Sequence, residues 1–121
     1  MEWKFDFATA GSIHFGCGRI AGIPDLLVRV DGPVLVVHGK TTEAALQLTQ
    51  RLDAAGVAWE AFKISGEPTI DTAVQGAETA RKLGVGQVAA VGGGSVMDAG
   101  KAIAALATNP GPASDYLEVV G

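Results

Sequence analysis

Apolar runs and amphipathic segments alternate regularly along the chain from residue 33 onward. The run 34–37, Val-Leu-Val-Val, has no polar position and predicts a central strand that is covered on both faces. Segments whose apolar residues recur every three or four positions follow it and predict helices. The expected elements are three strands, at 34–37, 57–64 and 87–91, and three helices, at 41–55, 69–83 and 95–106. The apolar stripe of the second helix comprises Ile70, Ala73, Val74, Ala77, Ala80 and Leu83.

The first thirty residues have a different pattern. Residues 4–9 alternate between apolar and polar positions, a turn follows at Ala10-Gly11, and residues 12–15 form a second short run. This pattern predicts a β-hairpin, followed by a glycine corner at 16–18. A short helix is expected to begin near Pro24 and to continue to Val30.

Strands alternating with helices predict a parallel sheet with right-handed crossovers. The simplest order places strand 34–37 between the other two. The order of the strands along the chain then reverses between strands 34–37 and 87–91, and ligands of open α/β sheets bind at such a switch point. The loops that meet there are 38–42 and 92–95. We therefore expect an α/β fold, a Rossmann-like doubly wound parallel sheet with an N-terminal β-hairpin, in one domain spanning 1–121.

The composition narrows the class of protein. A length of 121 residues allows one domain, and 48% apolar residues exclude intrinsic disorder. The net charge of −4 argues against a nucleic-acid partner, which usually requires a basic surface. No apolar run approaches the roughly 18 residues of a membrane span. A single cysteine cannot form an internal disulfide, so a cytoplasmic location is expected.

The loop Gly92-Gly93-Gly94-Ser95 is the most informative motif. Three glycines after a buried strand expose backbone N–H groups, and the positive end of the following helix points the same way, so the loop is suited to an anion. Ser95 and Asp98 have the spacing of a capping box. The loop lacks the Gly-Lys-Ser/Thr ending of a Walker loop. The alternative is a tight turn before an ordinary capped helix.

Gly92-Gly93-Gly94-Ser95, with Asp98 and Lys101 following, resembles the GGGSxxDxxK signature of iron-containing (group III) alcohol dehydrogenases. Residues 15–18, 67–69 and 115–117 also match the family in order and spacing. The resemblance covers essentially the whole chain but only the front part of such an enzyme. It implies that this is the dinucleotide-binding domain of a longer protein. A helical C-terminal domain would then supply one Asp and three His to a divalent metal, iron or zinc, and this chain would hold no catalytic residue and no metal ligand.

The resemblance also bears on the cofactor. NAD-preferring relatives carry an acidic residue in the loop that addresses the adenosine ribose, and here Gly39 stands in the matching place, followed by Lys40, Thr41 and Thr42. We therefore expect NADP(H) to be accepted. The alternative, a solvated Lys40 and a capping Thr42, leaves NAD(H) open. The expected cofactor-binding residues are Gly39, Lys40, Thr41, Thr42, Gly92, Gly93, Gly94, Ser95 and Asp98.

The expected function is hydride transfer between NAD(P) and a small alcohol or aldehyde by the full-length enzyme; the chain alone is not expected to be catalytically competent. Two alternatives remain. One is a related branch of the superfamily, such as glycerol or maleylacetate reductases or dehydroquinate synthases. The other is a nucleotide-binding module without catalysis. The resemblance further implies a homodimer through the N-terminal hairpin, which could instead pack onto its own sheet.

Overall fold

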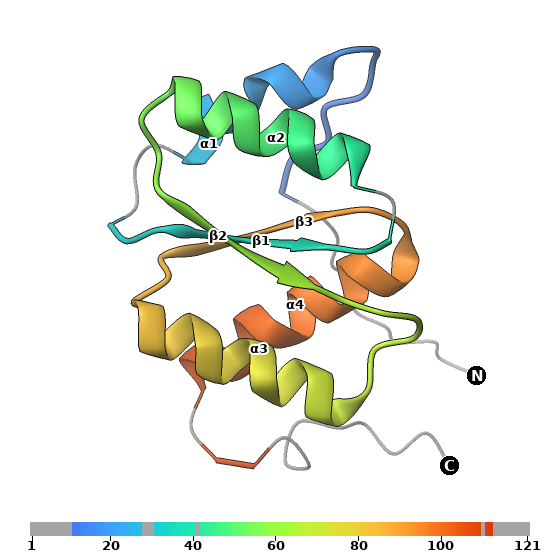
Figure 1. The fold of residues 1–121 in the computed structure, drawn as a ribbon, viewed down its shortest axis with the longest axis vertical. Helices are drawn as coiled ribbons and strands as arrows, with labels where there is room; N and C mark the ends of the chain where they lie inside the picture. Colours follow the sequence, from blue (N-terminus) through green and yellow to red (C-terminus); the bar gives the residue numbers. More distant parts are fainter. Residues whose placement is uncertain (1–10, 28–30, 41, 110, 113–121) are drawn as a thin grey trace, which may run out of the picture.

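The computed structural model describes residues 11–27, 31–40, 42–109 and 111–112. A parallel sheet lies between two layers of helices (Figure 1). The chain forms η1 (Arg19–Gly22), α1 (Ile23–Leu27), β1 (Val34–His38), α2 (Glu43–Ala54), β2 (Trp59–Lys63), α3 (Ile70–Leu83), β3 (Gln87–Val91) and α4 (Gly94–Thr108). This order confirms the expected α/β fold.

The sheet has the order β2-β1-β3, and both pairings of β1 are parallel. Leu35, Val36 and Val37 of β1 are fully buried, because helices cover both faces and neighbouring strands flank both edges. The register pairs His38, the last residue of β1, with Lys63 of β2 and Val91 of β3. The three strands therefore end at the same level, and the expected central position of the apolar run is confirmed.

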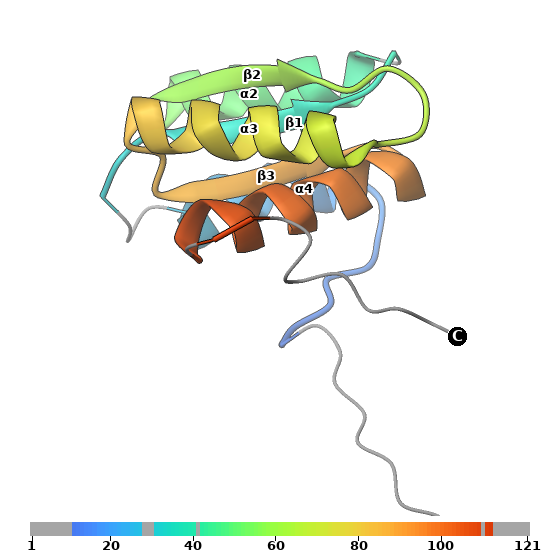
Figure 2. The ribbon, with the colours of Figure 1, turned by 90° about the horizontal axis from the view of Figure 1, so that it is seen from below.

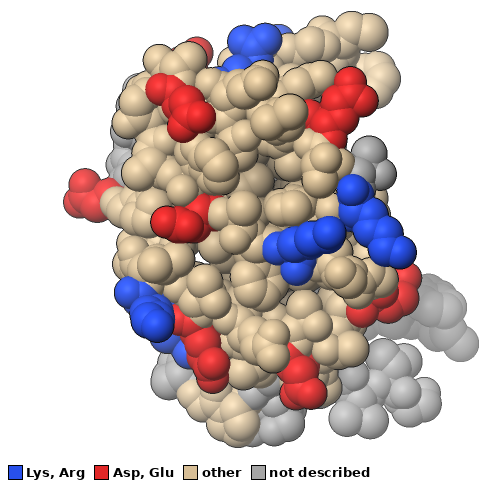
Figure 3. Space-filling model, in the orientation of Figure 1, with Lys and Arg blue, Asp and Glu red and all other residues tan. Residues whose placement is uncertain are grey.

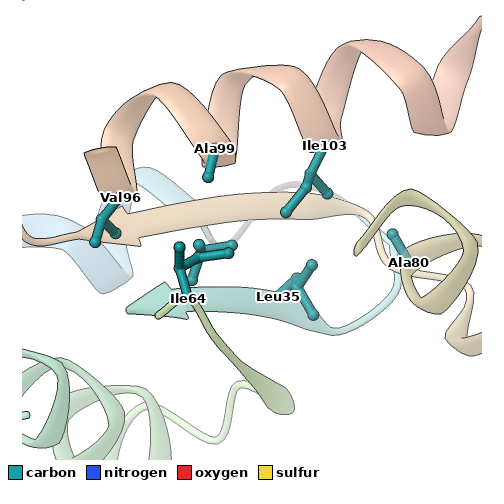
Figure 4. Packing of buried hydrophobic residues seen from close by; sticks show 7 residues of the cluster. Leu35, Ile64, Ala80, Val96, Ala99 and Ile103 are labelled. Atoms are coloured by element: carbon teal, nitrogen blue, oxygen red, sulfur yellow. The ribbon is translucent and has the colours of Figure 1, made fainter. Parts of the chain in front are cut away.

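Two clusters of buried side chains fix the layers. On one face, Val34 and Val36 pack against Leu48 and Leu52 of α2. On the other face, Leu35 and Val37 join Ile64 and residues of α3 and α4. Figure 4 shows Val96, Ala99 and Ile103 pointing from α4 toward Leu35 and Ile64. These clusters are separated by the central strand, whose alternate residues point to opposite faces.

The helices α3 and α4 lie side by side on one face of the sheet (Figure 2). The close approach of α3 and α4 depends on a small residue, because a Cβ on Gly76 would collide with the side chain of Ile103. Gly100 plays the same part between α4 and β3, where an added Cβ would lie 2.7 Å from Cβ of Ala90. The expected stripe of α3 is partly wrong for this reason. Ala73, Ala77 and Ala80 are buried as predicted, but Gly76 is buried with them. Ile70 and Leu83 are largely exposed.

Several boundaries follow the expected turn chemistry. Thr69 caps α3, since its hydroxyl accepts a hydrogen bond from the Thr72 backbone N–H at 3.1 Å. Gly84 ends α3 with φ of 65°, in the left-handed region that glycine adopts at least cost. The second strand begins two residues later than predicted, because the N–H of Val57 bonds to the carbonyl of Leu52 and so belongs to the turn after α2.

The N-terminal hairpin is the main difference from the expected fold. Residues 1–10, which include its first strand, lie outside the described residues. The second strand, expected over residues 12–15, does not form, and the side chain of Phe15 is 99% exposed. An isolated two-stranded hairpin is marginal in water without further strands or a helix to pack on. The expected helix from Pro24 is present as α1, although its predicted end at 28–30 is also outside the described residues.

Within the described ranges, no helix combines the length and the apolarity needed to cross a membrane.

Candidate cofactor site

The loops that follow β1 and β3 meet at the carboxyl end of the sheet, on the right of Figure 1. The first loop leads into α2 and the second into α4, so the N-termini of both helices lie at this edge. The order β2-β1-β3 makes this edge the switch point of the sheet. The structure therefore brings together the two loops that the sequence pattern paired.

Val96, in the first turn of α4, packs against glycines of both loops. A Cβ on Gly39 would lie 3.1 Å from Cγ2 of Val96, and a Cβ on Gly92 would lie 2.9 Å from the same atom. Val96 is only 7% exposed. Packing within the protein itself therefore disfavours a side chain at position 92, whereas one at position 39 would require Val96 to move by a few tenths of an ångström.

Gly93 and Gly94 have no such reason to be glycine. A Cβ at either position would have no atom within 4 Å. Gly93 has φ of −78°, which any residue adopts, and Gly94 is the first residue of α4, where glycine is less favourable than alanine. Neither fold nor packing excludes a side chain here, so the glycines keep clear a space beside the helix N-terminus.

The N-terminus of α4 carries no side-chain cap. Its N-cap residue is Gly93, and the Met97 N–H makes a helical bond to the Gly93 carbonyl at 3.0 Å. The N–H groups of the first turn have no intrahelical acceptor and point out of the helix end. The expected capping box of Ser95 and Asp98 is therefore wrong: the N-cap residue lies two positions before Ser95, which places Ser95 inside the first turn of the helix.

Ser95 instead contacts the loop after β2. Its hydroxyl donates a hydrogen bond to Oε1 of Glu67 at 3.1 Å. Sequence reasoning noted Glu67 only as part of a Glu-Pro-Thr match and assigned it no place in the site. Nothing in local spacing indicates this contact, because 28 residues separate the two side chains.

The loop after β1 forms the other end of the site. His38 Nδ1 and the Gly39 carbonyl are 3.0 Å apart, a geometry that allows the ring N–H to donate to the carbonyl. Lys40 is exposed, and Thr42 is the N-cap residue of α2 but makes no side-chain cap bond, so its expected capping role is wrong. Thr41 lies outside the described residues.

Lys63 is a second cation at this edge that sequence reasoning missed. It ends β2 beside His38, and the two-residue period places it on the same face as Ala61, which lines a hollow of about 200 Å³ together with His38 and Thr42. In Figure 3, blue basic side chains gather on the right at the level of the strand ends, with red acidic side chains above and below. The available signal was the position of Lys63 next to the end of the predicted strand 57–64.

Asp98 is exposed on α4, and nothing in its surroundings tests a role in binding a cofactor. Among the residues that the structure describes, no three His, Cys, Asp or Glu side chains gather where they could hold a metal ion. The described residues therefore do not fit a metal site, whereas the open glycine loop fits an anionic group of a nucleotide.

The sequence and the fold of this chain are similar to those of known proteins. The sequence model of the family described as iron-containing alcohol dehydrogenase matches residues 10–121. Lactaldehyde reductase of Escherichia coli is 32% identical over 101 residues, which cover 79% of this chain and 26% of that protein. The NADPH-dependent aldehyde reductase of the same species is 34% identical over 111 residues, covering 88% of this chain and 28% of that protein.

A solved structure shares the fold. Sulfoacetaldehyde reductase of Bifidobacterium kashiwanohense, in complex with NAD+, superposes with a TM-score of 0.77 at 28% identity, over 95% of this chain and 31% of that one. The chain thus spans about a quarter to a third of the length of the relatives that it matches.

Proposed function

Because this chain belongs to the iron-containing alcohol dehydrogenase family, we propose that it is the nicotinamide-dinucleotide-binding portion of a longer enzyme. That enzyme transfers hydride between NAD(P) and a small alcohol or aldehyde. The lactaldehyde and aldehyde reductases among its relatives support this substrate class. The domain assignment, 1–121, is part of the proposal.

One observation carries the proposal. Gly93 and Gly94 keep open a space that the protein does not need for its own packing, directly beside an uncapped helix N-terminus. A diphosphate would accept hydrogen bonds from the free N–H groups of the first turn of α4, and the helix dipole favours its negative charge. A side chain at either position would occupy that volume.

This portion of the chain binds and orients the cofactor. The nicotinamide itself supplies the hydride chemistry when it is bound. The metal that the family name implies does not fit the described residues, and we assign it to the remaining part of the enzyme. Gly92, Gly93, Gly94 and Ser95 are assigned to the diphosphate, and Gly39, Lys40, Thr41 and Thr42 to the adenosine ribose. Asp98 is assigned to the nicotinamide side on the resemblance alone.

The ribose end favours acceptance of NADP(H). Gly39 brings no carboxylate that would repel a 2′-phosphate, and Lys40 and Lys63 bring two positive charges to the same edge.

Substitution of Gly39 tests this cofactor preference. We expect Gly39→Asp to lower the affinity for NADPH by about tenfold or more relative to NADH, because a carboxylate would face the 2′-phosphate. Gly39→Ala is the matched control, since its Cβ exerts the same pressure on Val96 without the charge. Fluorescence titration of both reduced cofactors measures the ratio. An equal ratio in the aspartate and alanine variants would contradict the assignment.

The function as a whole is tested on the full-length protein. We expect reduced and oxidised nicotinamide dinucleotides to bind in calorimetric titrations, and a primary alcohol to reduce NAD(P)+ when divalent iron or zinc is present. Removal of the metal with a chelator should abolish turnover but leave dinucleotide binding intact, because the two sites lie in different parts of the protein. Binding without turnover on any alcohol would favour a nucleotide-binding module.

The proposal also covers the cellular location and the oligomeric state of the protein. We assign the protein to the cytoplasm, which fits the free, exposed thiol of Cys17. A homodimer through the N-terminal segment is supported by the exposure of Ile13 and Phe15, apolar side chains that a partner would remove from water.

A further inference from the structure

We infer that Glu67 is an internal competitor of the cofactor diphosphate and limits the affinity of the enzyme for its dinucleotide. This inference rests on the function proposed above. It concerns a residue that belongs to neither glycine loop but reaches the diphosphate site from the loop after β2.

The first argument concerns the hydroxyl of Ser95, which can donate only one hydrogen bond. A serine hydroxyl has one O–H, and that of Ser95 is donated to Oε1 of Glu67 at 3.1 Å. Ser95 lies in the first turn of α4, beside the open space at Gly93 and Gly94. A phosphate oxygen in that space can receive the Ser95 proton only after the bond to Glu67 has broken. Every binding event that uses this hydroxyl therefore exchanges one anionic acceptor for another.

The second argument is charge. The Glu67 carboxylate lies at the positive end of α4 and interacts favourably with it in the absence of cofactor. When a diphosphate arrives, the same carboxylate is a like charge beside it. The Glu67 side chain is exposed to solvent, so the repulsion is screened and its effect is modest. Glu67 thus stabilises the free site and destabilises the occupied one.

Glu67 therefore limits the affinity with which the cofactor binds. An oxidoreductase must release the used cofactor before the next turnover, and release is often the slow step of an enzyme. A carboxylate that takes back the Ser95 hydroxyl as the diphosphate leaves would accelerate that release. Because the diphosphate is common to both cofactors, Glu67 should act equally on NAD(H) and NADP(H).

Glu67→Gln is the decisive variant. Its amide oxygen can still accept from Ser95, while the negative charge is replaced by a neutral amide. We expect about two- to fivefold tighter binding of NADH and of NADPH, by the same factor, in fluorescence titrations of the full-length protein. Stopped-flow displacement should show that the change is mainly a slower dissociation. The gain should shrink in about 1 M salt, where charges are screened beyond roughly 3 Å.

Two further variants separate charge from geometry. Glu67→Ala frees the Ser95 hydroxyl as well and should bind at least as tightly as Glu67→Gln. Glu78→Gln on the exposed face of α3 makes the same change of net charge away from the site and should leave affinity unchanged. If Glu67 merely held Ser95 in place, the glutamine variant would match the wild type and the alanine variant would bind more weakly.

Unchanged or weaker binding by Glu67→Gln would overturn the inference while leaving the proposed function intact, provided that the wild type binds dinucleotide. A wild type that binds neither NADH nor NADPH would overturn both.

Discussion

Replacing Gly94 with valine is expected to abolish dinucleotide binding while leaving the protein folded. A valine side chain would fill the space at the start of α4 that we assign to the diphosphate, and its Cβ would have no protein atom within 4 Å. We expect a loss of roughly 100-fold or more in affinity for both cofactors, equivalent to about 2.8 kcal/mol. Calorimetric titration with NADH and NADPH measures it.

Gly94→Ala provides the internal control for this prediction. Alanine is a better helix former than glycine, so the variant should resist urea as well as the wild type or better, by up to about 1 kcal/mol. Its methyl group should nevertheless weaken cofactor binding, by less than valine does. Lower affinity together with unreduced stability indicates a ligand contact. Parallel losses of affinity and stability would show that Gly94 serves the fold.

The largest effect on stability is expected for Ile103→Ala. Ile103 is fully buried in the cluster where α4 packs on the sheet, and its side chain fills the space left by the absent side chain of Gly76. Truncation removes apolar contacts and leaves a cavity between α3 and α4 that the backbone cannot easily close. Losses of about 2–5 kcal/mol are usual for such changes. Urea unfolding of the wild type and the variant measures the difference.

Met97→Ala on the same helix is the matched comparison. Met97 is 46% exposed, so its truncation should cost less than about 1 kcal/mol. Similar losses from the two variants would contradict the position of Ile103 at the centre of the packing.

The parallel sheet was predictable because its signals are local and mutually consistent. The uninterrupted apolar run at 34–37 is typical of a strand covered on both faces, and β1 is that strand. Thr69 and Gly84 marked the two ends of α3 by the chemistry of helix caps. The right-handed crossover rule then left few arrangements, and the simplest of them is the one observed.

The helix packing was less accessible from the sequence. Gly76 carries no hydrophobic signal, yet it is buried because α3 approaches Ile103 too closely for a side chain. The pattern therefore selected Ile70 and Leu83 as members of the buried stripe, although they lie at the margins of the contact. Periodicity identifies apolar faces, but it does not reveal where two helices come close enough to require the smallest residue.

The candidate site was also predicted in part and missed in part. The two glycine loops were paired correctly because strand order alone decides which carboxyl ends adjoin. Glu67 and Lys63 were missed because their places depend on β2, whose neighbours in space are distant in sequence. The capping box was wrong because the N-cap residue of α4 is Gly93, two positions before Ser95. Errors of one or two residues at helix ends are ordinary.

The position of Val96 has a consequence for changing the coenzyme preference that we propose for this chain. The isopropyl group of Val96 lies behind both loops. Its Cγ2 atom would be 3.1 Å from a Cβ added at position 39 and 2.9 Å from a Cβ added at position 92. A side chain introduced at position 39 to change ribose selectivity would contact Val96, which also packs against the glycine turn at Gly92. A substitution that alters the preference between NAD and NADP should therefore also alter the affinity for the diphosphate. Variants selected for a new coenzyme should acquire a smaller residue at position 96 together with the change at position 39.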